Sequence, residues 1–75
     1  MSHGKNEINK VKSILFAVRE KRISKGYTQQ FVADKLGISQ NAYSKIELGL
    51  SKVTIPTLCT LAEIFETELL EFIIV

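Results

Sequence analysis

Four polar residues in the middle of the chain have the types and spacing needed to recognise base pairs: Gln40, Asn41, Ser44 and Lys45. They fall at i, i+1, i+4 and i+5, so an α-helix places them on one face. A carboxamide both donates and accepts and can pair bidentately with adenine, whereas an ammonium favours the acceptors of guanine. The pattern therefore predicts a helix whose outer face recognises base edges in the DNA major groove.

The flanking residues predict where this helix begins and ends. Ser39 is a good N-cap, because its hydroxyl can accept from a backbone N–H that the first turn leaves unpaired. Tyr43 and Ile46 fall on the opposite side from the polar face and are expected to point inward. Gly49 is expected to end the helix.

Another short helix is predicted immediately before the one that Ser39 caps. Thr28 is its expected N-cap, and its apolar stripe consists of Val32, Ala33 and Leu36. Gly37 can end it in a left-handed conformation, after which Ile38 fills the corner between the two helices. Phe31 lies beside the stripe and is expected to be a partly covered surface residue.

Two helices of this length are marginal alone, so the rest of the chain must support them. A first helix is predicted over residues 7–23, with apolar residues at helical spacing: Ile8, Val11, Ile14, Leu15 and Val18. Thr54 is expected to cap a largely apolar fourth helix with Pro56 in its first turn, and a short fifth helix should begin at Thr67 or Glu68. The 75 residues thus predict one all-α domain over residues 7–75, preceded by a flexible tail over residues 1–6.

The ordered set Thr28–Gln29, Ala33, Leu36–Gly37–Ile38–Ser39, Tyr43–Ser44, Ile46–Glu47 and Gly49 resembles the phage Cro/repressor (Xre-like) helix-turn-helix family. This resemblance implies a five-helix lambda-repressor-like fold with its motif at residues 28–47, and a transcriptional regulator that binds double-stranded DNA. It also implies that Glu47 ties the motif to the first helix through an arginine. Leu48 and Glu66 depart from the family pattern, since a polar residue and a helix-ending glycine are usual there.

Six residues are expected to contact DNA phosphates. By the resemblance or by their place beside the motif, these are Gln29, Ser39, Arg19, Arg22, Ser51 and Lys52. For Arg19 and Arg22 a structural alternative is open, because cations also stabilise the C-terminal end of a helix dipole.

Charge is distributed unevenly along the chain. Residues 1–52 hold all ten Lys and Arg against four acidic residues, which gives +6, whereas residues 53–75 hold four Glu and no cation, which gives −4. This asymmetry suits a protein whose motif half approaches phosphates. The alternative is a solvated surface without a partner.

The C-terminal segment predicts contact with a second copy of the chain. Leaving its apolar residues in water would be unfavourable, and the expected interface consists of Leu69, Phe72, Ile73, Ile74 and Val75. A two-fold dimer formed here would place two recognition helices about one DNA turn apart. The alternative is that the segment packs on its own core.

Other classes of function find little support in the sequence. An enzyme is disfavoured because no catalytic constellation or glycine-rich phosphate loop is present, and no cofactor, metal or small-molecule ligand is expected. The single Cys59 is predicted to be a buried small hydrophobe, and His3 is remote from it. Without a transmembrane run or signal peptide, a cytoplasmic location is expected, and the family resemblance implies a bacterial or phage-encoded, nucleoid-associated protein. The competing hypothesis is a protein-interaction module such as an antitoxin, for which DNA binding is secondary.

Overall fold

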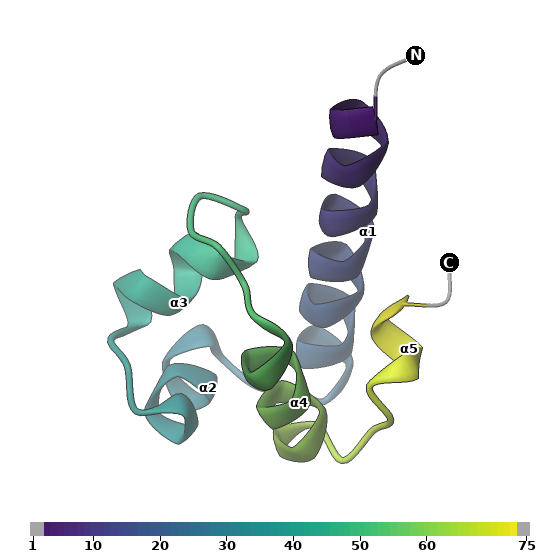
Figure 1. Ribbon diagram of the computed structural model, residues 1–75. Coiled ribbons are helices and arrows are strands. Elements are labelled where there is room, and N and C mark those ends of the chain that lie inside the picture. The colour runs from purple at the N-terminus through teal and green to yellow at the C-terminus, as the bar shows by residue number, and fades with distance from the viewer. Residues whose placement is uncertain (1–2, 74–75) are drawn as a thin grey trace.

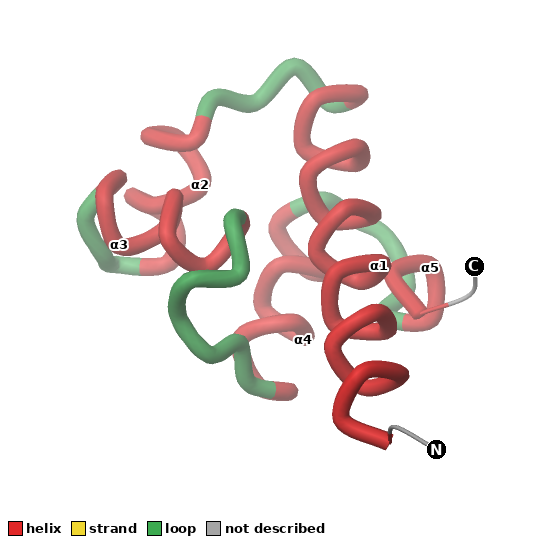
Figure 2. Tube along the Cα trace, turned by 90° about the horizontal axis from the view of Figure 1, so that it is seen from above, coloured by secondary structure: helices red, strands yellow, loops and turns green. Residues whose placement is uncertain are grey.

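The computed structural model describes residues 3–73, and all the regular structure in that range is helical (Figure 1). The helices are α1 His3–Ser24, α2 Gln29–Leu36, α3 Gln40–Glu47, α4 Ile55–Ile64 and α5 Leu70–Ile73. The all-α, five-helix prediction is therefore confirmed over these residues. In two perpendicular views α5 lies beside α1, while α3 lies at the opposite edge of the molecule (Figures 1 and 2).

The first helix is longer than the sequence predicted. It begins at His3 rather than at Glu7, and its first turns extend beyond α2, α3 and α4 (Figure 1). Leu15 and Val18 are buried as expected, but Val11 is 43% exposed because it lies where α1 leaves the body of the domain. Only the second half of α1 therefore serves as the scaffold for the motif.

One hydrophobic core holds the domain together, and every helix contributes to it. Its buried members are Val18, Val32, Ala33, Tyr43, Leu58, Leu61, Ala62, Phe65 and Phe72. The members from α2 and α3, Val32, Ala33 and Tyr43, were all predicted to point inward. The other predicted residues are less covered: Leu36 and Ile38 are partly buried against the same core, and Ile46 is half-buried. Burial of these side chains fixes α2 and α3 on α1 and α4, as two short helices require.

Hydrogen bonds confirm the predicted N-caps of α2, α3 and α4, whereas α5 begins at Leu70 rather than at Thr67 or Glu68. The hydroxyls of Thr28, Ser39 and Thr54 accept from backbone N–H groups three residues ahead, at 3.0, 3.0 and 3.2 Å. Gly37 adopts φ 75° in the left-handed region, and the next N–H, that of Ile38, donates back to the Ala33 carbonyl at 3.0 Å. The sharp corner between α2 and α3 therefore depends on a residue without a Cβ.

The prediction of a buried Cys59 is wrong. The thiol-bearing residue is exposed, because the buried stripe of α4 consists of Leu58, Leu61, Ala62 and, one residue past the helix, Phe65. These positions follow the i, i+3, i+4, i+7 pattern of an amphipathic helix, and Cys59 falls outside it. The fourth helix is thus amphipathic, with one buried face.

The C-terminal helix packs on its own domain. Phe72 is fully buried and meets Phe65 edge-to-face, with ring centroids 6.1 Å apart. Lys21 Nζ on α1 also contacts the Glu71 carboxylate at 2.9 Å. Phe72 therefore belongs to the protomer's core and not to a free surface, contrary to its place in the predicted interface, whereas Ile73 remains 43% exposed. Ile74 and Val75 lie outside the described residues.

The turn after α4 has a glycine-like backbone without a glycine. Glu66 adopts φ 54°, and the N–H groups of Glu66 and Thr67 donate to the carbonyls of Glu63 and Ala62 at 3.1 and 2.9 Å. This is the hydrogen-bond pattern of a helix C-terminus that normally ends in glycine. The departure from the family pattern at this position is therefore one of residue type and not of backbone path.

Replacing this residue with glycine should stabilise the fold. The left-handed conformation costs an L-residue about 1–2 kcal/mol, of which the extra backbone entropy of glycine cancels part. We expect Glu66→Gly to raise the free energy of unfolding by about 0.5–1 kcal/mol, measured by urea denaturation. The control is Glu63→Gly inside α4, which should instead lower it by about 1 kcal/mol. Destabilisation by Glu66→Gly would contradict the strain at this turn.

Candidate nucleic-acid interface

The outer face of α3 presents the polar side chains that the sequence singled out. Gln40, Asn41 and Lys45 are exposed and Ser44 is half-buried, whereas Tyr43, on the other side of the helix, is fully buried. The predicted outward orientation is therefore confirmed. Contact of these residues with bases stays a prediction.

A buried carboxylate holds α3 to the first helix. Arg22 donates from Nε to Glu47 Oε2 at 2.7 Å and from Nη2 to Oε1 at 3.1 Å, in a bidentate ion pair. The side chains of Arg22 and Glu47 are only 11% and 2% exposed. The arginine that the family resemblance implied is thus Arg22, and its role in tying the motif to α1 is confirmed.

Two further donors complete the surroundings of the Glu47 carboxylate. The Tyr43 hydroxyl donates to Oε2 at 2.6 Å, and Gln29 Nε2 donates to Oε1 at 3.1 Å. Arg22 Nη1 also donates to the Tyr27 carbonyl, at 2.9 Å. We call Arg22, Gln29, Tyr43 and Glu47 the carboxylate cluster. The part played by Tyr43 was missed in the sequence, although a buried tyrosine usually needs a hydrogen-bond partner and Glu47 lies one helical turn away.

The cluster shifts the titration of its own members. Burial alone would raise the pKa of Glu47, but hydrogen bonds from Arg22, Tyr43 and Gln29 outweigh it and hold that pKa below its usual value. Burial, with the nearby Glu47 carboxylate, raises the pKa of the Tyr43 hydroxyl. At neutral pH the cluster therefore contains an ionised carboxylate and a neutral phenol that donates to it.

The six expected phosphate ligands fall into two groups. Arg22 and Gln29 are engaged inside the protein by the carboxylate cluster, and Gln29 Oε1 also accepts from Gln40 Nε2 at 3.4 Å. The other residues are surface residues: Arg19, Ser39 and Lys52 are exposed and Ser51 is half-buried. Contact with phosphate stays a prediction for all six, and two of them already have a structural role.

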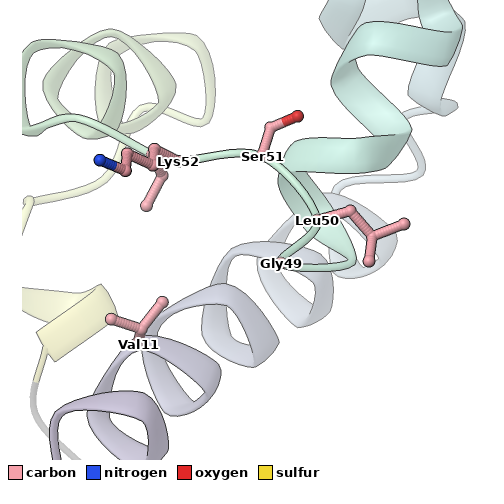
Figure 3. A pocket seen from close by; sticks show the side chains of 6 residues that line it. Val11, Gly49, Leu50, Ser51 and Lys52 are labelled. Atoms are coloured by element: carbon pink, nitrogen blue, oxygen red, sulfur yellow. The ribbon is translucent and has the colours of Figure 1, made fainter. Parts of the chain in front are cut away.

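The loop after α3 forms one wall of an open groove. About 330 Å³ in volume, the groove is lined by Val11 of α1 and by the loop residues Gly49, Leu50, Ser51, Lys52 and Val53. Figure 3 shows the Val11 side chain directed toward the loop and the Ser51 hydroxyl directed away from Val11. Ser51 is thus presented on the outside of the loop that follows the recognition helix.

Phe31 is a partly covered surface residue, as the sequence predicted. It is 39% exposed, and its ring centroid lies 4.6 Å from that of Tyr27. The Lys35 ammonium lies 5.4 Å from the centroid of the Phe31 ring, within range of a cation–π contact. These contacts account for Phe31 as part of the surface of α2.

The described part of the chain offers neither a metal cluster nor a membrane-spanning helix. The structure describes the side chains of residues 10–73, and among them no group of three or more His, Cys, Asp or Glu is positioned to hold a metal ion. In the same residues no helix combines the length and the hydropathy that crossing a bilayer demands.

Comparison with known proteins identifies the motif. The family model described as helix-turn-helix matches residues 18–72, which include the last two turns of α1, the motif, α4 and all but the last residue of α5. The chain belongs to the helix-turn-helix family. The resemblance to Cro/repressor (Xre-like) proteins is confirmed, and the all-α fold agrees with it.

A curated relative of this helix-turn-helix protein comes from Bacillus subtilis (strain 168). It is the SPbeta prophage-derived uncharacterized HTH-type transcriptional regulator YonR, 46% identical over 43 residues. The match covers 57% of this chain and 40% of the relative, so this chain spans less than half of that protein's length. No solved structure matches the chain significantly.

Removal of the arginine should destabilise the helix-turn-helix domain strongly. Arg22→Ala leaves the Glu47 carboxylate buried without its cation, and breaking a buried ion pair in this way costs about 3 kcal/mol or more. The measurement is urea denaturation at neutral pH. Arg19→Ala, the same substitution at an exposed position of the same helix, is the control and should change stability by less than about 0.5 kcal/mol. Equal effects of the two substitutions would contradict the structural role of Arg22.

Stability should also fall in acid because of Glu47. Its pKa is lowered in the folded state, so the unfolded chain takes up a proton first as pH falls through 4.5, the ordinary pKa of a glutamate. The unfolded state then binds more protons than the native state, and stability is lost progressively below that pH. We expect the urea midpoint of the wild type to drop more steeply between neutral pH and about pH 3 than that of Glu47→Gln. Parallel pH profiles for the two proteins would show that Glu47 is not the group responsible.

Proposed function

We propose that this protein is a transcriptional regulator of the repressor or controller type, which binds double-stranded DNA sequence-specifically and reads the major groove as a homodimer. The observation that carries this proposal is the exposed amide-bearing face of α3, held on the domain by the carboxylate cluster. Membership of the helix-turn-helix family supports it, as does the similarity to a prophage-derived HTH-type transcriptional regulator. Such a regulator acts in the cytoplasm, at the nucleoid.

Base recognition falls to the first half of α3. Gln40 and Asn41 are exposed at its N-terminal end, the part of a recognition helix that enters the major groove. Each can pair bidentately with adenine, while Lys45 favours guanine and Ser44 can donate or accept. The two carboxamides therefore carry most of the discrimination.

Phosphate contacts surround this helix. Arg19, Ser39, Ser51 and Lys52 are the surface candidates, and the Ser39 hydroxyl can still donate while its oxygen caps α3. Gln29 and Arg22 can contact phosphates only through those of their N–H groups that do not already donate a hydrogen bond within the protein. The charge of +6 on residues 1–52 favours the approach of this side of the protein to DNA.

A two-fold contact through α5 suits this arrangement. Leu70 and Ile73 of α5 are exposed, Leu69 is half-buried, and the apolar Ile74 and Val75 follow in sequence. Because α5 and α3 lie at opposite edges, a dimer formed at α5 leaves both recognition helices free (Figures 1 and 2). Such a dimer selects DNA sites with two inverted half-sites about one helical turn apart.

Selection of bound duplexes from a random pool tests the proposal. The wild type should recover a near-palindromic site. Gln40→Ala should relax preference at one position of each half-site, by about 1–3 kcal/mol. Lys45→Ala should weaken binding to the selected site and reduce the slope of log affinity against log salt by about 1 if its ammonium neutralises a phosphate.

The control is Lys35→Ala, which removes the same charge from the outer surface of α2. It should leave both the preference and the salt slope unchanged. Recovery of no preferred sequence by the wild type would contradict the regulator function and favour a protein-interaction module. A single non-repeated half-site would contradict the homodimer alone.

A further inference from the structure

A continuous path of hydrogen bonds joins the buried cluster to the first residue of the recognition helix. Glu47 Oε1 accepts from Gln29 Nε2 at 3.1 Å, and Gln29 Oε1 accepts from Gln40 Nε2 at 3.4 Å. Gln29 lies at the start of α2, so it bridges the first and last residues of α3. The exposed Gln40 is therefore in contact, through one side chain, with a carboxylate that is almost completely buried.

The chemistry of the carboxylate fixes the direction of this path. An ionised carboxylate only accepts hydrogen bonds, so it must face the NH₂ end of the Gln29 amide and not its oxygen. The Gln29 oxygen is then directed at Gln40, which must donate a hydrogen bond to it from its own NH₂ group. Reversing the Gln29 amide would place its oxygen against Glu47 Oε1, an unfavourable contact between two acceptors in a part-buried site.

We propose that Glu47 is a specificity-positioning residue, which sets the orientation of the Gln40 carboxamide through Gln29 although it is itself buried. This inference rests on the proposed function, because it concerns how the same helix discriminates bases. With one N–H of Gln40 engaged by Gln29, the side chain presents its other N–H and its oxygen outward in a fixed order. Adenine offers one acceptor and one donor in the major groove, so a fixed order matches that base in one placement only.

Two variants interrupt the path, and a third is the matched control. Glu47→Gln keeps the size of the side chain but can donate as well as accept, so the Gln29 amide is free to reverse. Gln29→Leu removes the link and leaves the bonds of Arg22 and Tyr43 to Glu47 intact. Tyr43→Phe removes a different bond of the same carboxylate, the one to Oε2, and leaves Oε1 and Gln29 in place.

The experiment measures affinity for four duplexes. They carry the site selected by the wild type from a random pool and differ only at the base pair where Gln40→Ala relaxes preference. Each protein is assayed at a temperature where thermal melting shows it to be folded. We expect a preference of about tenfold or more for the wild type, and of about threefold or less for Glu47→Gln and Gln29→Leu. Tyr43→Phe should melt at a lower temperature yet keep the wild-type preference.

The outcomes separate this inference from the proposed function. An unchanged preference in Glu47→Gln, or an equal loss of affinity for all four duplexes, would overturn the positioning role while the regulator function stands. Should Glu47→Gln fail to fold, Gln29→Leu decides: a preserved preference overturns the path from Glu47 to Gln40. Loss of preference in Tyr43→Phe would overturn it too, since any disturbance of the cluster would then suffice. If the wild type selects no sequence, it is the function that fails.

Discussion

The arrangement of this domain depends on one buried carboxylate, that of Glu47. It accepts from Arg22 on α1, Gln29 on α2 and Tyr43 on α3, so three helices meet at two oxygen atoms. A carboxylate taken out of water costs several kcal/mol unless its acceptor sites are filled, which these donors do. Such a pair need not increase net stability over a hydrophobic replacement, but it favours one relative placement of the three helices. The geometry of the recognition helix, rather than the stability of the domain, is what the cluster most directly explains.

The rest of the fold supports α2 and α3, which are too short to be stable alone. Neither α2 nor α3 is long enough to persist alone, and both derive their order from burial of Val32, Ala33 and Tyr43 against α1 and α4. The glycine at residue 37 then sets the corner, and the hydroxyl caps define where each helix begins. Because the inner side of α3 is used in this packing, its outer side is left to polar residues, of which Gln40 is hydrogen-bonded to Gln29.

Local signals in the sequence were enough to predict the helices, their caps and the outward face of α3. Thr28, Gly37 and Ser39 act within a few residues of themselves, so their roles do not depend on the rest of the fold. The errors have a different origin. Whether Phe72 faces a partner or its own core, and whether Cys59 is buried, depends on which way α5 and α4 turn toward α1, and periodicity does not specify that. Charge and position along the chain also gave no sign that Arg22 and Gln29 bond to a buried acceptor 25 and 18 residues away, and their contact with phosphates stays a prediction. The sequence also did not predict that α1 begins at His3 and extends beyond the other helices, because the polar composition of its first turns resembles that of a flexible tail.

The central claim, that the outer face of α3 lies against DNA, is tested most directly by nuclear magnetic resonance. A ¹⁵N-labelled sample is titrated with the duplex recovered from a random pool, and the backbone and side-chain amide signals are followed. The largest shifts should fall on the amides of residues 39–45, including the NH₂ groups of Gln40 and Asn41, while the exposed amides of α4 should change little. Unchanged signals from α3, with shifts confined to α4 or α5, would contradict that claim.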